Sequence, residues 1–243
     1  MAGITLHVLA FVWLGAFLGA LAVGAAGFAF ALAASALWLH VLDPLRATFL
    51  VAACGTMLHI GIIWRIRRNI EPRRLAPFVV AGLAGVPIGI YVLPRFDQHA
   101  IKIALGVFLV AYGLYALLAP RLPKVAHGGR AADAAVGFLS GILGGLGGYS
   151  GVLPTIWTQL RGWPKEAARG VYQPFILVMQ IATLVAAGFV TFDPTSLALI
   201  VAALPALLAG AWLGWLGFGR LDERRFRQIL AVMIAASGAM LVI

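Results

Sequence analysis

The sequence has 243 residues, of which 63% are hydrophobic and only 11% are charged. A soluble domain needs about a quarter of its residues charged to cover its surface, so this composition excludes an ordinary soluble protein. Apolar runs of roughly 18 or more residues are typical of membrane-spanning helices, and such runs occupy most of the chain. The composition therefore predicts an all-α, polytopic integral membrane protein.

The net charge of +10 does not indicate nucleic-acid binding. Basic residues cluster between apolar segments, as they do where helices end beside anionic lipid headgroups. No platform of aromatic and basic residues suited to single-stranded nucleic acid is present. The clusters are Arg65, Arg67, Arg68, Arg73 and Arg74; Arg121, Lys124 and Arg130; and Arg220, Arg224, Arg225 and Arg227.

About eight transmembrane helices are predicted in chain order. The apolar segments cover residues 4–41, 47–64, 76–94, 101–119, 133–160, 170–190, 195–218 and 226–243. Most are close to the ~20 residues that one crossing takes. The first is long enough for a crossing plus a part-crossing, the fifth also exceeds one crossing, and glycines interrupt both. The N-terminus lacks the Lys or Arg that precedes a cleavable signal, so we expect the first segment to be retained.

The sequence also predicts two repeat-related halves of four segments each. A slide of 125 positions places Gly85 on Gly210, Gly89 on Gly214, Arg95 on Arg220, Asp97 on Asp222, Lys102 on Arg227 and Gly113 on Gly238. A slide of 121 places Phe17 on Phe138, Gly24 on Gly145, Gly27 on Gly148 and Phe28 on Tyr149. We expect a first repeat at 1–120, a breaker-rich linker at 121–131 and a second repeat at 132–243. With an odd number of crossings per half, the two halves would have opposite orientations in the membrane. With an even number, they would have the same orientation.

The most informative motif is the stretch from Gly144 to Pro154. Glycine costs about 1 kcal/mol and proline about 3 relative to alanine in a helix, so the motif opposes a continuous helix. A broken helix survives in a membrane only when it is buried or lines a wet cavity, and free N–H groups at a half-helix start attract anions. We interpret Gly147, Gly148, Ser150, Gly151 and Pro154 as candidate substrate-binding residues. Close packing of two helices through glycines is the alternative.

Polar residues of the following segment complete the candidate site. Arg169 falls near the start of that segment, where it could anchor to headgroups or attract an anion to the path. Gln173 and Gln180 are seven residues apart and share one helical face with Thr183. Such amides either hold helices together or contact substrate.

In the first half, Thr56 and His59 occupy the corresponding region. A histidine inside an apolar segment is a functional candidate by default, here for substrate or proton handling. His59 is five residues from the Trp64-Arg65 boundary, so an interfacial position is the alternative.

Gly148-Tyr149-Ser150-Gly151 also matches the G-x-S-G nucleophile motif of rhomboid-type intramembrane proteases, for which only His59 could serve as base. A non-transporting membrane scaffold is a further alternative. Every carboxylate falls at a segment end or in a loop, and no Cys or His spacing suits a metal. We therefore expect no enzyme activity, no cofactor and no metal, and a site better suited to an anion than to a cation.

These motifs resemble those of the sulfite exporter TauE/SafE family of membrane permeases. The resemblance rests on the duplication, on the glycine-rich motif from Gly144 to Pro154, and on Ala168-Arg169-Gly170 at the next helix start, with Asp43-Pro44-Leu45-Arg46-Ala47-Thr48 as its first-half counterpart. It implies a secondary transporter or exporter for sulfite, a sulfonate or a related organosulfur anion. The expected partners are this small anion and the lipid bilayer, a homo-oligomer is compatible with the sequence, and the Arg-rich composition favours a bacterial inner membrane.

Overall fold

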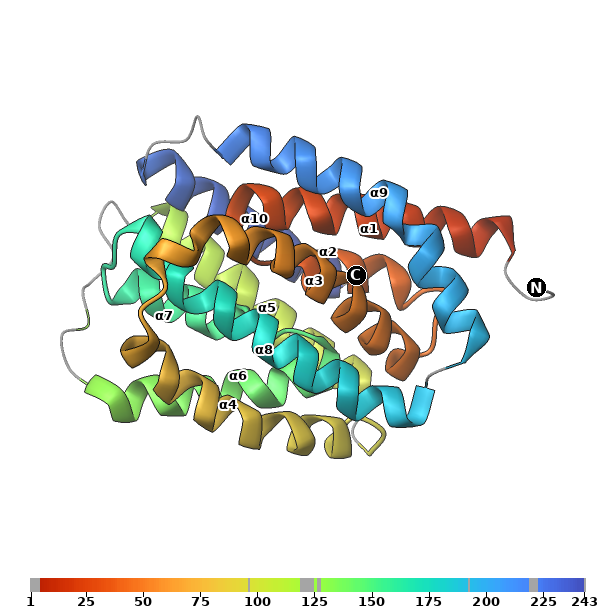
Figure 1. The fold of residues 1–243 in the computed structure, drawn as a ribbon, viewed down its shortest axis with the longest axis horizontal. Coiled ribbons are helices and arrows are strands. Elements are labelled where there is room, and N and C mark those ends of the chain that lie inside the picture. Colours follow the sequence, from red (N-terminus) through yellow and green to blue (C-terminus); the bar gives the residue numbers. More distant parts are fainter. Residues whose placement is uncertain are drawn as a thin grey trace.

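The computed structural model describes residues 5–95, 97–118, 125, 128–191, 193–218 and 223–242. These residues form a bundle of helices (Figure 1). The elements are α1 (Leu6–Ala26), α2 (Phe30–Trp38), α3 (Pro44–Ile66), the 3-10 helix η1 (Arg67–Asn69), α4 (Pro72–Val92), α5 (Gln98–Leu118), α6 (Gly129–Gly147), α7 (Val152–Leu160), α8 (Lys165–Thr191), α9 (Pro194–Phe218) and α10 (Glu223–Val242).

Each predicted apolar segment corresponds to one long helix or, in the two glycine-interrupted cases, to a long and a short helix. Residues 4–41 contain α1 and α2, and residues 133–160 contain α6 and α7. In the described ranges, five stretches are long and apolar enough to span a membrane: Leu6–Gly24, Pro44–Asn69, Pro72–Val92, Lys165–Gly188 and Pro194–Leu216. The fold is therefore all-helical and of the polytopic membrane type.

The two short helices fold back along the helices that precede them. Trp38, the last residue of α2, donates from Nε1 to the carbonyl of Val12 in α1 at 3.2 Å. Trp157 in α7 donates from Nε1 to Oδ1 of Asp133, near the start of α6, at 2.8 Å. The pairs α1–α2 and α6–α7 are thus helical hairpins, and they enter the bundle from opposite ends (Figure 1).

Glycines set the contacts of α4 with the α6–α7 hairpin and of α9 with the α1–α2 hairpin. On α4, Gly85 lies against the backbone of Phe138 and Gly89 against that of Ile142, so α4 runs parallel to α6. Trp13 of α1 donates from Nε1 to the carbonyl of Ala202 at 2.7 Å, and Gly210 lies against the backbone of Phe17, so α1 runs parallel to α9. Lipid tails supply no hydrophobic drive between helices, and small residues instead let backbones approach closely.

The helices α3 and α8 cross the middle of the bundle in opposite directions (Figure 1). Phe49 near the start of α3 lies against Gly188 near the end of α8, and Gly55 lies against Gln180. The helices α5 and α10 are likewise antiparallel, because Gly113 packs on Ala231 and Gly238 packs on Gly106. The helices α3 and α8 lie between the α1–α2 hairpin and the α6–α7 hairpin (Figure 1).

The contact between α4 and α6 leaves no room for a side chain at Gly141. A Cβ there would meet the backbone of Gly82, which cannot move aside. We expect Gly141→Ala to lower the free energy of unfolding by about 1–3 kcal/mol, as overpacking does elsewhere. Thermal unfolding of the purified protein in detergent measures this change. The matched control is Gly61→Ala, where an added Cβ meets nothing within 4 Å; equal unfolding temperatures for the two variants would contradict the packing.

Candidate functional site

Each hairpin turns at a glycine in the left-handed conformation. Gly27 (φ 83°) ends α1 and donates its N–H to the carbonyl of Val23 at 2.7 Å. Gly148 (φ 78°) ends α6 and donates to the carbonyl of Gly144, also at 2.7 Å. Left-handed glycine is the usual way to end a helix, because it carries no Cβ penalty there. The interruption predicted within 144–154 is therefore present, at residues 148–151.

Beyond these turns, the N-termini of α2 and α7 converge on one cavity. Phe30, Ala31 and Leu32 line it from α2, and Gly151 and Val152 line it from the start of α7. Neither helix has a side-chain cap at its N-terminus. The first N–H groups of a helix lack partners within that helix, and they carry the positive end of its dipole. Both hairpins thus direct positive potential toward the same space.

The two hairpin tips touch each other beside this cavity. A Cβ built on Gly151 would lie 3.5 Å from the Cβ of Phe28, the residue that follows the first turn. The cavity has a volume of about 20 Å³ for the centres of water-sized molecules. Such a space holds at least one water molecule, and it must widen to hold a larger solute. In this structure the site is therefore too narrow for a solute much larger than water.

Two polar side chains of the central helices also line the cavity. His59 of α3 is 1% exposed and Gln180 of α8 is 2% exposed. Among the described residues, neither Nε2 of His59 nor Oε1 of Gln180 has a hydrogen-bond partner. Leaving a buried polar atom unpaired costs about 1–3 kcal/mol, so such atoms usually serve a water molecule or a ligand. No carboxylate is among the cavity-lining side chains in the described part of the chain.

The hydroxyls of Ser150 and Thr183 form a second unpaired set behind the α6–α7 turn. Both are buried, and neither Oγ of Ser150 nor Oγ1 of Thr183 has a partner among the described residues. Both lie against Gly144, where an added Cβ would be 3.2 Å from the Cβ of Ser150 and 3.8 Å from Oγ1 of Thr183. Ser150 makes no hydrogen bond with His59, so the serine–histidine pair of the hydrolase interpretation is not formed.

Arg169 and Gln173 surround the turn of the other hairpin. Nε2 of Gln173 lies 3.3 Å from the carbonyl oxygen of Gly27, and a Cβ on Gly27 would also meet the Arg169 guanidinium. With its amide rotated, Gln173 accepts from Nε and Nη2 of Arg169 at 3.2 and 3.1 Å. Arg169 is only 5% exposed, so it lies inside the bundle and not among lipid headgroups.

The remaining sequence-predicted residues lie elsewhere. Gly147 lies against the ring of Tyr149, and Pro154 is buried in the first turn of α7. Thr56 is half-buried and donates from Oγ1 to the carbonyl of Ala52 in its own helix at 2.7 Å, and it does not line the cavity. The cavity thus includes Gly148, Gly151, His59 and Gln180 from the predicted set. It omits Gly147, Ser150, Pro154, Arg169, Gln173 and Thr56.

Sequence reasoning missed the apolar part of the lining. Phe28, Phe30, Leu32 and Ile176 line the cavity, yet each is an ordinary hydrophobic residue in an apolar segment. Only the sequence repeat pointed to part of this lining. It aligns Phe28 with Tyr149, and these two residues, which follow the turns at Gly27 and Gly148, both line the cavity.

Comparison with known proteins identifies the family. The family model described as "Sulfite exporter TauE/SafE" matches residues 11–241, nearly the whole chain. No protein of curated function and no solved structure matches significantly. Together with its apolar helices, this match shows that the chain is a multi-pass membrane protein of the sulfite exporter TauE/SafE family.

Proposed function

We propose that this protein is a secondary transporter that moves a small anion, such as sulfite, a sulfonate or a related organosulfur compound, through the cavity between its two hairpin tips. Membership of a transporter family supports the class of function. The observation that carries the proposal is the convergence of two uncapped helix N-termini on one cavity. Helix N-termini bind anions through free N–H groups and the helix dipole.

The side chains around the cavity fit an anion better than a cation. Unpartnered groups of His59 and Gln180 line it, and the Arg169 guanidinium lies beside the neighbouring turn at Gly27. Carboxylates, which cation sites prefer, are missing from the lining in the described ranges. A scaffold protein would need no such cavity, so the cavity favours transport over the scaffold alternative.

We further propose that residues 1–120 and 132–243 are inverted repeats joined by the linker 121–131. Contacts that correspond under the two sequence slides support this. Gly85 lies against Phe138 as Gly210 lies against Phe17, and Gly113 packs on Ala231 as Gly238 packs on Gly106. The corresponding helices α3 and α8 run in opposite directions, as do α5 and α10. In this scheme each half contains one hairpin and three crossings, an odd number.

Inverted repeats suggest how access alternates between the two sides. Each hairpin enters from one end of the bundle, so withdrawing one tip would open the cavity toward one side only (Figure 1). The first tip rests on Gln173 of α8, and the second on Val51 of α3. Rocking of one half against the other would exchange these contacts around a fixed site.

A flux measurement tests the proposed function. We expect proteoliposomes containing the native chain to take up labelled sulfite or a simple sulfonate. Gly148→Leu should abolish flux, because its side chain would meet Val51 at a residue with φ of 78°. Gln180→Ala should reduce flux about tenfold or more, the equivalent of losing a hydrogen bond to a charged group. The control is Thr56→Ala, which lies outside the cavity and should match the native chain.

Absence of flux for every tested anion, with a known transporter active in the same vesicles, would contradict the proposed function. Equal flux through the native chain and Gly148→Leu would instead place the path elsewhere in the bundle.

The two ends of the bundle differ in charge, which suggests an orientation in the membrane. Among the described side chains that are not buried, one end carries Arg65, Arg67, Arg68, Arg73, Arg74, Arg130, Arg161, Lys165 and Arg225. The other end carries Arg46 and Arg95. Lys and Arg concentrate on the cytoplasmic side of membrane proteins, so we place the first end in the cytoplasm.

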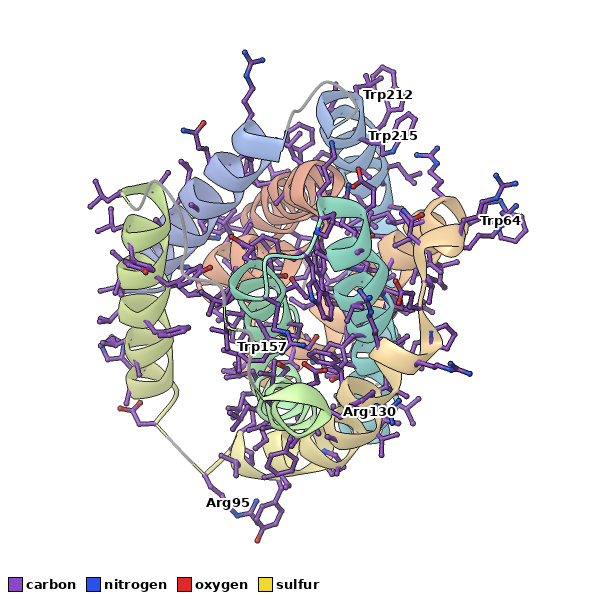
Figure 2. The ribbon with its side chains drawn as sticks, turned by 90° about the vertical axis from the view of Figure 1, so that its left-hand side faces the viewer. Trp64, Arg95, Arg130, Trp157, Trp212 and Trp215 are labelled. Atoms are coloured by element: carbon purple, nitrogen blue, oxygen red, sulfur yellow. The ribbon has the colours of Figure 1, made fainter. Side chains whose placement is uncertain are left out.

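Aromatic residues mark the headgroup level at the same end. Figure 2, which looks onto this end, shows Trp64, Trp212 and Trp215 projecting from the edge of the bundle. The guanidinium of Arg65 lies 4.1 Å from the centroid of the Trp215 ring. Exposed tryptophans with basic neighbours are typical of the membrane interface. In a bacterial inner membrane, both the start of α1 and the end of α10 would then lie on the outer side.

Cysteine labelling tests this orientation. In intact bacteria, a membrane-impermeant maleimide should label Asp97→Cys at once, and Arg67→Cys only after the cells are permeabilised. Both positions are exposed, and the native Cys54 is fully buried and should stay silent. The reverse labelling pattern would overturn the orientation without affecting the site.

A further inference from the structure

The hydrogen bond of His59 fixes which ring nitrogen carries its proton. Nδ1 lies 2.8 Å from the carbonyl oxygen of Gly55, one turn earlier in α3. A carbonyl oxygen can only accept, so Nδ1 holds the proton and donates it. In the neutral imidazole, Nε2 then carries a bare lone pair. Among the described residues this nitrogen makes no hydrogen bond of normal geometry, although the Gly27 carbonyl and the Gln180 amide face the ring and the ring lines the cavity.

A bare lone pair is unsuited to a cavity that binds an anion. It can accept a hydrogen bond but cannot donate one, and it repels a negative oxygen at contact distance. Only the imidazolium form presents an N–H donor at Nε2 while keeping the bond from Nδ1 to Gly55. An anion beside His59 therefore gains a strong, charge-assisted hydrogen bond if one proton enters with it.

The groups that face His59 strengthen the link between anion binding and protonation of the ring. From α8 they are the guanidinium of Arg169 and the amide of Gln180, and from the first hairpin the carbonyl of Gly27. The phenol of Tyr149 lines the same cavity from the second hairpin. Arg169 is the charged group among them, and its positive charge opposes a second positive charge on His59 while the cavity is empty. A bound anion removes this opposition.

We propose that His59 takes up one proton with each anion that enters the cavity, so that the protein carries anion and proton together. The inference rests on the proposed function. On binding, a proton from the aqueous side bonds to Nε2, and Nε2–H donates to the anion. On release, the anion and the proton leave together and Nε2 regains its lone pair. No carboxylate lines the cavity in the described residues, so histidine is the suitable acceptor.

Proton uptake during binding tests the inference on the purified full chain. The probe is methanesulfonate, because a sulfonate stays ionised between pH 5 and 9 whereas sulfite itself titrates in that range. Protein in weak buffer with a pH indicator is titrated with pH-matched methanesulfonate, and binding is measured in parallel by calorimetry. We expect the native chain to take up about one proton per bound anion. Its affinity should fall about tenfold per pH unit at alkaline pH, by linkage.

Two histidine variants separate the proposed role from a structural one. His59→Gln offers a neutral amide donor, so it should bind and carry the anion without proton uptake and with little pH dependence. His40→Gln alters an exposed histidine at the end of α2 and should behave as the native chain does. If His59→Gln does not fold, the inference is tested by the native chain alone, through its proton uptake and the pH dependence of its affinity for methanesulfonate.

The outcomes distinguish this inference from the proposed function. Binding by the native chain without proton uptake, at an affinity independent of pH, would overturn the inference and leave anion transport intact. The same holds if His59→Gln still takes up one proton per anion. Failure of the native chain to bind or move any anion would overturn the proposed function, and this inference with it.

Discussion

The arrangement of the molecule depends on one constraint, that backbone polar groups cannot be left open to lipid. Both hairpins break their helices at a left-handed glycine, Gly27 or Gly148, and so open backbone at the depth of the bundle. Each turn must therefore be buried in protein. The first is covered by Gln173 of α8 and the second by Val51 of α3. The close glycine contacts of α4 with α6 and of α1 with α9 hold the hairpins in place around these turns.

The two turns are covered by chemically different surfaces. Arg169 and Gln173 lie against Gly27, whereas aliphatic Val51 lies against Gly148. Arg46, which the family resemblance aligns with Arg169, pairs instead with Asp193 at 2.9 Å at the start of α3. Most polar groups near the cavity therefore come from α8, with His59 of α3 as the main exception.

The sequence predicted those features that leave a local signature. Helix breakers are visible in sequence, so the interruption after Gly147 was predictable, and apolar segment lengths indicated the extra short helices α2 and α7. The directions of the helices were not predictable from the sequence. The length of residues 4–41 does not show whether the short second helix continues across the membrane or folds back along the first helix as a hairpin. Contacts such as that of Gly24 with Trp215 are needed to decide. Because the helix directions were not predictable, the sequence did not show which charge clusters lie on the same side of the membrane.

Polarity alone singles out some of the side chains that line the cavity. His59 and Gln180 are polar residues in apolar helices, and both line the cavity. Thr56 is also a polar residue in an apolar helix, but its hydroxyl donates to the carbonyl of Ala52 in the same helix, and Thr56 does not line the cavity. Helical register decides such cases, and three residues separate Thr56 from His59. The apolar wall formed by Phe28 and its neighbours carries no polar signal at all.

A reversible link between the two hairpin tips tests directly whether the anion passes between them. Phe28 and Gly151 have the Cβ spacing of a disulfide, 3.5 Å, so a Phe28→Cys, Gly151→Cys double variant with Cys54→Ala should cross-link on mild oxidation. We expect oxidation to stop anion flux and reduction to restore it, while each single-cysteine variant is insensitive to oxidation. A cross-linked protein that still carries the anion at the native rate would contradict a path between the tips.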